Sequence, residues 1–147
     1  MRPLYLVDTC IWSEAGKSRP NAQVLNCLER YQELLAISAV CWHELVYGIE
    51  RLPPGKRKED LHRYLMEVLA PNIPVIPYDE SVAWVHARIR IRLEAAGSTI
   101  PFVDSLIAAT AIANNMILVT RNTGDFTAIN ELMIENWFEG SPGSPVE

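Results

Sequence analysis

The sequence predicts an α/β fold, a three-layer sandwich in which helices cover a mainly parallel sheet of four to five short strands. Short apolar runs that end in polar or turn residues alternate along the chain with longer segments whose apolar residues recur at helical spacing. This alternation is typical of parallel sheets whose strands are connected by helices. The chain has 147 residues, of which 49% are hydrophobic, and this is enough for one domain with its own core.

The strand predictions rest on short apolar runs. Residues 4–7 form such a run, and Asp8 ends it. Runs of this length without an alternating polar face are typical of strands that are buried on both sides. The predicted strands are residues 4–7, 34–37, 75–76 and 116–119, with residues 132–134 as a fifth.

The helix predictions rest on start and stop signals around segments of helical periodicity. Ser38 is the expected N-cap of a helix that ends before residues 52–55, because two prolines and a glycine follow there. Asp79 is the expected N-cap of a helix that Gly97 ends. A helix through residues 61–69 is expected to stop at the proline at position 71. The remaining predicted helices cover residues 20–31 and 101–115.

We expect one domain and a short tail. Residues 1–138 carry all the predicted elements, whereas residues 139–147 are mostly Gly, Ser and Pro, which predicts a flexible tail. No apolar run reaches the length of about 18 residues that could cross a membrane. Asp8 interrupts the N-terminal apolar run before it could form the core of a signal peptide. The three cysteines have no C-x-x-C spacing, which indicates free thiols, and we expect a cytoplasmic protein.

The net charge of −5 is unusual for a protein that acts on nucleic acid. Four of the 18 acidic residues are candidates for one site, namely Asp8, Glu44, Asp104 and Asp125, and without them 14 acidic residues stand against 13 basic ones. Carboxylates that gather at one site are neutralised when they bind divalent cations. The charge therefore does not exclude a nucleic-acid substrate.

Oxygen-bearing side chains follow the ends of the predicted strands. Asp8 comes directly after the first strand, Glu44 lies about two turns into the helix after the second, and Asp104 lies in the first turn of the helix before the fourth. Asn122 and Asp125 follow the fourth strand. Ligands of open α/β sheets bind at the carboxyl ends of the strands, and hard divalent cations prefer oxygen ligands. The sequence therefore predicts a site for Mg²⁺ (or Mn²⁺) that Asp8, Glu44 and Asp104 hold.

At these positions the sequence resembles the PIN-domain ribonucleases, and more narrowly the VapC-type toxins of bacterial type II toxin–antitoxin pairs. The similarity extends over roughly residues 4–138 and is specific because five blocks occur in order. The blocks are Leu6-Val7-Asp8-Thr9, then Ile37-Ser38 with His43-Glu44-Leu45 and Tyr47-Gly48, then Asp104-Ser105-Leu106-Ile107-Ala108-Ala109, then Leu118-Val119-Thr120-Arg121-Asn122-Thr123-Gly124-Asp125-Phe126, and last Ile134-Glu135-Asn136-Trp137.

The resemblance implies a PIN-like sandwich and a metal-dependent endoribonuclease, the toxin of a toxin–antitoxin pair, that cleaves structured RNA. It also implies a homodimer and a cognate antitoxin protein whose tail occupies the active-site groove. The catalytic residues that it implies are Asp8, Glu44, Asp104 and Asn122. Many relatives have an acid at the position of Asn122, whose amide oxygen can coordinate a cation but adds no charge. Either Asn122 or Asp125 would complete the site.

Two further expectations concern the surface. Trp12 and Trp84 look more exposed than a monomer with one small core would need, and this favours a homodimer. Basic residues that could contact RNA phosphates are also present. These candidates are Lys17, Arg19, Arg121 and the stretch Lys56-Arg57-Lys58.

The expected reaction is hydrolysis by a metal-activated water, because no Ser or Cys has an adjacent base that would make it a nucleophile. Glu44 would bind the metal or orient the water as a base, and the products would carry a 5′-phosphate and a 3′-hydroxyl. A catalytically degenerate PIN-fold module that binds RNA or protein is the alternative, because Asn122 lacks the charge of an acid. A haloacid-dehalogenase phosphatase would need a second Asp two residues after Asp8, where Cys10 stands.

Overall fold

Residues 2–139 are described by a computed structural model, which confirms the α/β class. Within these residues, five strands form one sheet in the order β3-β2-β1-β4-β5, and every neighbouring pair is parallel. The central strand β1 places Leu6 opposite Ala36 of β2 and Leu118 of β4. The strands are β1 Tyr5–Val7, β2 Leu35–Ser38, β3 Val75–Ile76, β4 Ile117–Val119 and β5 Ile134–Glu135.

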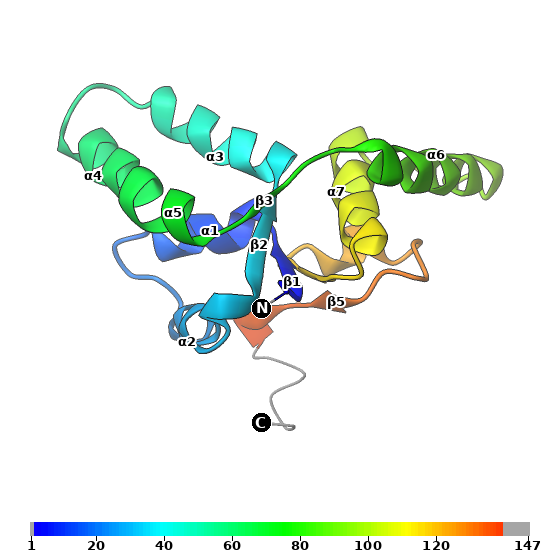
Figure 1. The fold of residues 1–147 in the computed structure, drawn as a ribbon, viewed down its shortest axis with the longest axis horizontal. Coiled ribbons are helices and arrows are strands. Elements are labelled where there is room, and N and C mark those ends of the chain that lie inside the picture. Colours follow the sequence, from blue (N-terminus) through cyan, green and yellow to red (C-terminus); the bar gives the residue numbers. More distant parts are fainter. Residues whose placement is uncertain (1, 140–147) are drawn as a thin grey trace.

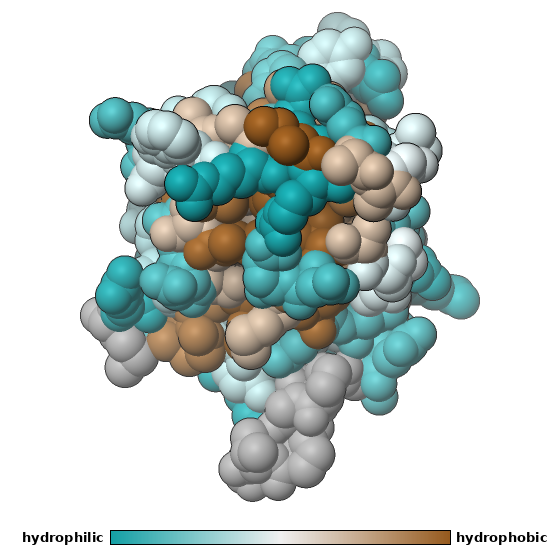
Figure 2. Space-filling model, turned by 90° about the vertical axis from the view of Figure 1, so that its right-hand side faces the viewer, coloured by the Kyte–Doolittle hydropathy of each residue, from teal (hydrophilic) through white to brown (hydrophobic). Residues whose placement is uncertain are grey.

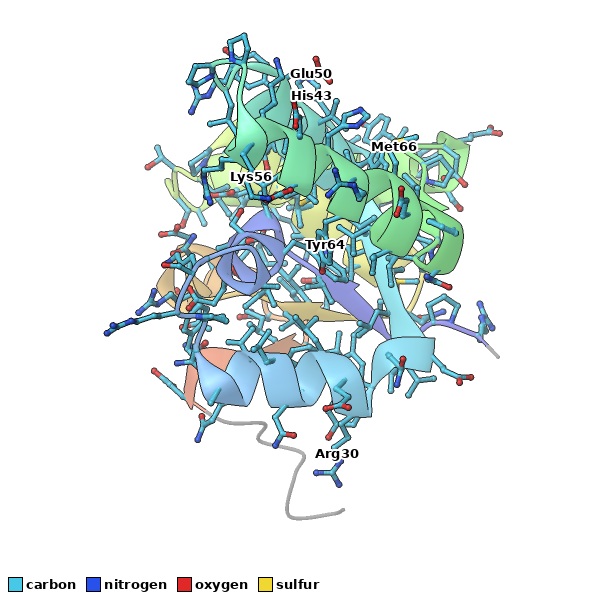
Figure 3. All side chains as sticks on the ribbon, turned by 90° about the vertical axis from the view of Figure 1, so that its left-hand side faces the viewer. Arg30, His43, Glu50, Lys56, Tyr64 and Met66 are labelled. Atoms are coloured by element: carbon cyan, nitrogen blue, oxygen red, sulfur yellow. The ribbon has the colours of Figure 1, made fainter. Side chains whose placement is uncertain are left out.

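Helices surround this sheet. Figure 1 shows α3, α4 and α5 together on one side of the molecule and α6 beside α7 on the other. The view in Figure 3 places α2 and α4 on opposite sides of the strands, as a layered sandwich requires. The α-helices are α1 Thr9–Ala15, α2 Ala22–Arg30, α3 Ala39–Glu50, α4 Lys56–Tyr64, α5 Ala70–Asn72, α6 Glu80–Ala95 and α7 Phe102–Ala113. The short 3₁₀ or π segments are η1 Gln32–Leu34, η2 Leu65–Leu69, η3 Thr123–Phe126 and η4 Trp137–Glu139.

The central strand β1 is the middle of the core. All three of its residues are buried, as expected for a strand with a parallel neighbour on each side and helices above and below. Tyr5 packs its ring at 5.3 Å from that of Trp137, which is fully buried and anchors the end of the described chain. Because β1 is fixed along its whole length, the residue that follows it also has a fixed position. That residue is Asp8.

Three sequence-based expectations about local structure are wrong in detail. Helix α1 was not expected; Asp8 caps it, and Ile11 and Trp12 bury one face of it. The helix through α4 does not stop at Pro71. The π turn η2 comes just before this proline, which lies in the first turn of α5, where its missing N–H is tolerated. The fifth strand covers Ile134–Glu135 and not residues 132–134.

The structure describes only one residue of the predicted tail. Most of the predicted tail, residues 139–147, lies outside the described residues, and Glu139 itself ends η4. In the described part of the chain, no helix combines the length and the apolar character that a membrane span needs.

Candidate functional site

Asp8 is held at the carboxyl end of β1 by the start of the next helix. Its backbone is extended, with φ −73° and ψ 158°, and its Oδ1 accepts the backbone N–H of Thr9 at 2.7 Å. This is the geometry of an N-cap, and the positive end of the α1 dipole favours the charged carboxylate. The strand and the helix that follows it therefore fix both the position and the orientation of Asp8.

Further donors converge on the same carboxylate. The hydroxyl of Thr120, directly after β4, donates to Asp8 Oδ2 at 2.8 Å. Cys41 Sγ lies 3.5 Å from Asp8 Oδ1 and Cys10 Sγ lies 3.8 Å from Oδ2. Burial, and secondly the charge of Asp8, raises the pKa of Cys41 to about 12, so this thiol is protonated and can donate. With 9% of its surface exposed, Asp8 is a buried carboxylate that protein donors satisfy from several sides.

Thr9 joins Asp8 to the second predicted acid. Its backbone N–H donates to Asp8 Oδ1, and its hydroxyl donates to Glu44 Oε1 at 2.8 Å. Glu44 lies on α3, which begins after β2 with Ser38 as its N-cap. Glu44 is exposed on the wall of the site. Its side chain is therefore both positioned from α1 and open to a ligand.

Asp104 comes from the first turn of α7, as expected, and is half-buried. Burial raises the pKa of its carboxyl group, and the negative charges of Asp125, Asp8 and Glu44 raise it further, in that order. The four acids are thus near enough to repel one another. Such repulsion is relieved when a cation binds between the carboxylates.

Asn122 and Asp125 take different places beside Asp104. The backbone N–H of Asn122 donates to Thr120 Oγ1 at 3.1 Å, and its side chain lines the same cleft as Asp8, Glu44 and Asp104. Asp125, in η3, does not line the cleft, although its charge acts on Asp104 more strongly than those of the other two acids. Asn122 is therefore part of the cleft wall, and Asp125 is an electrostatic neighbour outside it.

The cleft has a volume of about 660 Å³ and is open to solvent. Besides the predicted residues, the cleft is lined by His43, Tyr47 and Gly48 of α3 and by Arg51, the C-cap of α3. Sequence reasoning missed these four as site residues. Tyr47, Gly48 and Arg51 lie at i+3, i+4 and i+7 from Glu44, and His43 lies four residues before Tyr47. This helical periodicity was the signal that could have found them. Helix α3 is thus one whole wall of the cleft.

The basic residues that were predicted to contact phosphates do not line this cleft, and several are engaged elsewhere. Lys17 pairs with Glu14 at 2.8 Å, and Lys56 pairs with Asp60 at 3.0 Å. The guanidinium of Arg121 lies 4.1 Å from the centre of the Phe138 ring. Among the described residues that line the cleft, Arg51 is the one lysine or arginine.

The donor set fits a hard divalent cation in its chemistry. Asp8, Glu44, Asp104 and Asn122 offer oxygen atoms to one cleft, where burial first and neighbouring carboxylates second raise the pKa of Asp104. Within residues 2–139, however, no three His, Cys, Asp or Glu side chains are arranged so that they could hold a metal ion. That Asp8, Glu44 and Asp104 are metal ligands therefore stays a prediction.

The fold and the site define an α/β protein with a parallel sheet and a carboxylate-lined cleft at the carboxyl ends of its strands. Known proteins resemble the chain in sequence and in fold. A family model described as PIN domain matches residues 5–132. The chain is 33% identical over 139 residues to Toxin FitB of Neisseria gonorrhoeae, and the alignment covers 92% of this chain and 100% of that protein. It is 30% identical over 133 residues to the tRNA(fMet)-specific endonuclease VapC of Shigella flexneri, covering 90% of this chain and 97% of that protein.

A solved structure supports the same assignment. The crystal structure of FitAcB from Neisseria gonorrhoeae superimposes with a TM-score of 0.84 at 32% identity, covering 92% of this chain and 99% of that one. Taken with the family match over residues 5–132, this shows that the chain belongs to the PIN domain family.

Proposed function

We propose that the protein is a divalent-metal-dependent endoribonuclease and the toxin of a toxin–antitoxin pair. The observation that carries this proposal is that Asp8, Glu44, Asp104 and Asn122, from four separate stretches of chain, line one open cleft at the carboxyl ends of the strands. The names of the relatives support it, since one is a toxin and another is a tRNA-specific endonuclease. Structured RNA is the proposed substrate class.

The side chains of the cleft would divide the work. Mg²⁺ or Mn²⁺ held by Asp8, Glu44 and Asp104 would supply positive charge against the scissile phosphate and lower the pKa of a water molecule. Asp8, fixed by Thr120 and by the cap of α1, is the rigid member of this set. Glu44, which is exposed, can orient an attacking water and accept its proton. Asn122 offers an amide oxygen and two amide hydrogens to a phosphate or a sugar.

The test is cleavage of a mixed RNA pool by the purified chain with Mg²⁺ or Mn²⁺, with and without EDTA. We expect cleavage that EDTA abolishes and that Asp8→Asn reduces to background. Asp8→Asn keeps the size of the side chain and an oxygen that can accept the N–H of Thr9, and its amide nitrogen can donate to the hydroxyl oxygen of Thr120. It also removes one negative charge beside Asp104, so its unfolding temperature should stay close to that of the wild type. Equal cleavage by the wild type and Asp8→Asn would refute the proposed site.

The alternative is a PIN-fold module that binds RNA or protein without cleaving it. Two observations favour it: an amide at position 122, and the lack of a three-ligand arrangement within residues 2–139. RNA binding by the wild type without cleavage in either Mg²⁺ or Mn²⁺ would support this module. The same RNA pool therefore separates the two functions.

The antitoxin would enter through a groove beside the cleft. An apolar groove of about 220 Å³ lies between α1, α3 and α4 and shares Thr9, Ser13, Glu44 and Gly48 with the cleft. An apolar segment seated there would reach the acids directly. Leu61→Glu, on the α4 side of the groove, should weaken inhibition by the antitoxin and leave RNA cleavage by the free protein unchanged. We propose that both proteins and the RNA meet in the cytoplasm, in agreement with the expectation from the sequence.

A homodimer is also part of the proposal, although one of its two sequence arguments is wrong. Trp12 is buried and donates its indole N–H to Val7 O at 3.1 Å, so it is not available for a dimer contact. Trp84 on α6 is 63% exposed and Ile91 on the same helix is 66% exposed. Figure 2 shows hydrophobic side chains gathered on this side of the molecule between hydrophilic ones. Light scattering should give the mass of two chains, and Trp84→Glu should give that of one.

A further inference from the structure

The cleft has a wall that the proposed chemistry does not use. His43 and Tyr47 of α3 and Arg51, its C-cap, follow one another at intervals of four residues, and all three line the cleft with the acids. We call these three residues the α3 stripe. The carboxylates need to bind a cation, whereas the α3 stripe offers two aromatic rings and a guanidinium. It is suited to a different part of the substrate.

Tyr47 is the centre of the α3 stripe. Its side chain is 58% exposed, although a tyrosine ring carries a large apolar surface that is usually at least partly buried. The imidazole of His43 lies 6.2 Å from its ring centre, and the guanidinium of Arg51 lies 5.3 Å from it. An exposed tyrosine ring between an imidazole and a guanidinium is a platform on which a nucleic-acid base can stack.

Arg51 supplies the charge that the cleft otherwise lacks. In the described part of the chain it forms no ion pair with a carboxylate, and it is the one lysine or arginine that lines the cleft. It lies seven residues after Glu44, about 10 Å along a helix with a rise of 1.5 Å per residue. Arg51 would therefore contact a phosphate next to the scissile one and not the scissile phosphate itself.

Gly48 leaves space beside the α3 stripe. A Cβ atom built at this position would meet no other atom within 4 Å. A glycine inside an exposed helix destabilises it by comparison with alanine, and packing gives no reason for it here. The space that it leaves open lies between Glu44 and Arg51, where a nucleotide reaching from the acids to the guanidinium would pass.

From these observations we infer that the α3 stripe is a binding subsite for one unpaired RNA nucleotide beside the scissile bond. The base stacks on Tyr47 and its phosphate contacts Arg51. The base must be unpaired because a base inside a duplex does not present its face to a side chain. The inference rests on the proposed function, since it names the form of RNA that the same cleft accepts.

The test measures binding separately from cleavage. All variants carry Asp8→Asn so that RNA stays intact, and fluorescence anisotropy gives Kd for a labelled single-stranded RNA of random sequence and for the same RNA annealed to its complement. We expect Tyr47→Leu to weaken single-strand binding by about tenfold, equivalent to about 1.4 kcal/mol, and to change duplex binding little. Tyr47→Phe keeps the ring and should bind within about twofold of the parent protein.

Arg51→Gln should weaken binding and lower the slope of log Kd against log salt by about one, as expected when one phosphate contact is lost. Arg63→Gln on α4 is the matched control, because it removes the same charge outside the cleft and should leave the slope unchanged. Gly48→Val should weaken RNA binding by filling the space beside the α3 stripe. In each case an unchanged unfolding temperature shows that the protein is folded.

Two results would overturn the inference. One is that Tyr47→Leu and Arg51→Gln leave the binding of single-stranded RNA unchanged. This result would overturn the inference even if the two variants bound the antitoxin more weakly. The other is an equal loss in the Arg63→Gln control. If the unmodified protein fails to cleave RNA with any divalent metal, the proposed function fails, while the binding measurements still decide whether the α3 stripe holds a nucleotide.

Discussion

The hydroxyl of Thr120 offers a direct way to test how the site depends on the fold. Thr120 has no exposed surface, and its hydroxyl donates to Asp8 Oδ2 at 2.8 Å while it accepts the backbone N–H of Asn122 at 3.1 Å. Thr120→Val keeps the shape of the side chain and removes both bonds, together with the weaker contact of the hydroxyl with Cys10 Sγ at 3.8 Å. A buried hydrogen bond to a charged group contributes about 1.5–3 kcal/mol, and an unsatisfied backbone N–H costs about 1 kcal/mol or more.

The two losses together should lower the free energy of unfolding by about 3 kcal/mol. For a chain of 147 residues the entropy of unfolding is about 0.3 kcal/mol per kelvin, so the unfolding temperature should fall by about 10 °C. Thr120→Ser is the control, because it keeps the hydroxyl and removes one buried methyl group, which costs about 1 kcal/mol.

Thermal unfolding followed by circular dichroism measures both variants, and RNA cleavage is assayed below their unfolding temperatures. We expect Thr120→Ser to be the more stable of the two and to keep most activity, whereas Thr120→Val loses activity because Asp8 is no longer held. A Thr120→Val protein as stable as Thr120→Ser would refute the claim that this hydroxyl secures the site.

Four further outcomes follow from the same structure. Burial and the neighbouring acids raise the pKa of Asp104, so its charged carboxylate destabilises the protein without a metal ion. Asp104→Asn should therefore raise the unfolding temperature in EDTA by a few degrees and abolish cleavage, and a lower unfolding temperature would count against this reasoning. Burial and the charge of Arg90 lower the pKa of His86 below its ordinary value of 6.5, so the unfolded chain binds the proton more readily than the folded one. The free energy of unfolding of the wild type, measured by denaturant titration, should therefore fall between about pH 7 and pH 5 more steeply than that of His86→Gln. Trp137→Ala should cost about 3–5 kcal/mol, measured by urea unfolding, because the ring is fully buried. Added Mg²⁺ should raise the unfolding temperature of the wild type in thermal scans but not that of Asp104→Asn.

Much of the site could be predicted because parallel strands bring their ends together. Asp8 and Asn122 follow strands, and their positions in the cleft come directly from the rule that ligands bind at the carboxyl ends. The hydroxyl of Thr9 could not be predicted, because its bond to Glu44 joins residues 35 positions apart and depends on how α1 packs against α3. Arg51 was missed for another reason, since charge alone does not distinguish a lysine or arginine in the cleft from one paired on the surface.

The fold, like the site, could be predicted in part from the sequence. Apolar runs and caps located the strands and most helices, including α3 with Ser38 as its cap and α6 with Asp79 as its cap. Helix α1 was missed because its cap, Asp8, was interpreted only as a site residue, although one side chain serves both roles. Trp12 shows the matching error: a tryptophan in an unassigned segment looks exposed until the helix that buries it is recognised.

The chemistry of the RNA ends tests the central claim most directly. Hydrolysis by a water that the carboxylate cleft activates does not use the RNA 2′-hydroxyl as the nucleophile. The products of the wild-type protein should therefore carry a 5′-phosphate and a 3′-hydroxyl, detected by ligation and by mass spectrometry of a cleaved RNA. Products that end in a 2′,3′-cyclic phosphate would contradict the account, because they require attack by the substrate's own hydroxyl.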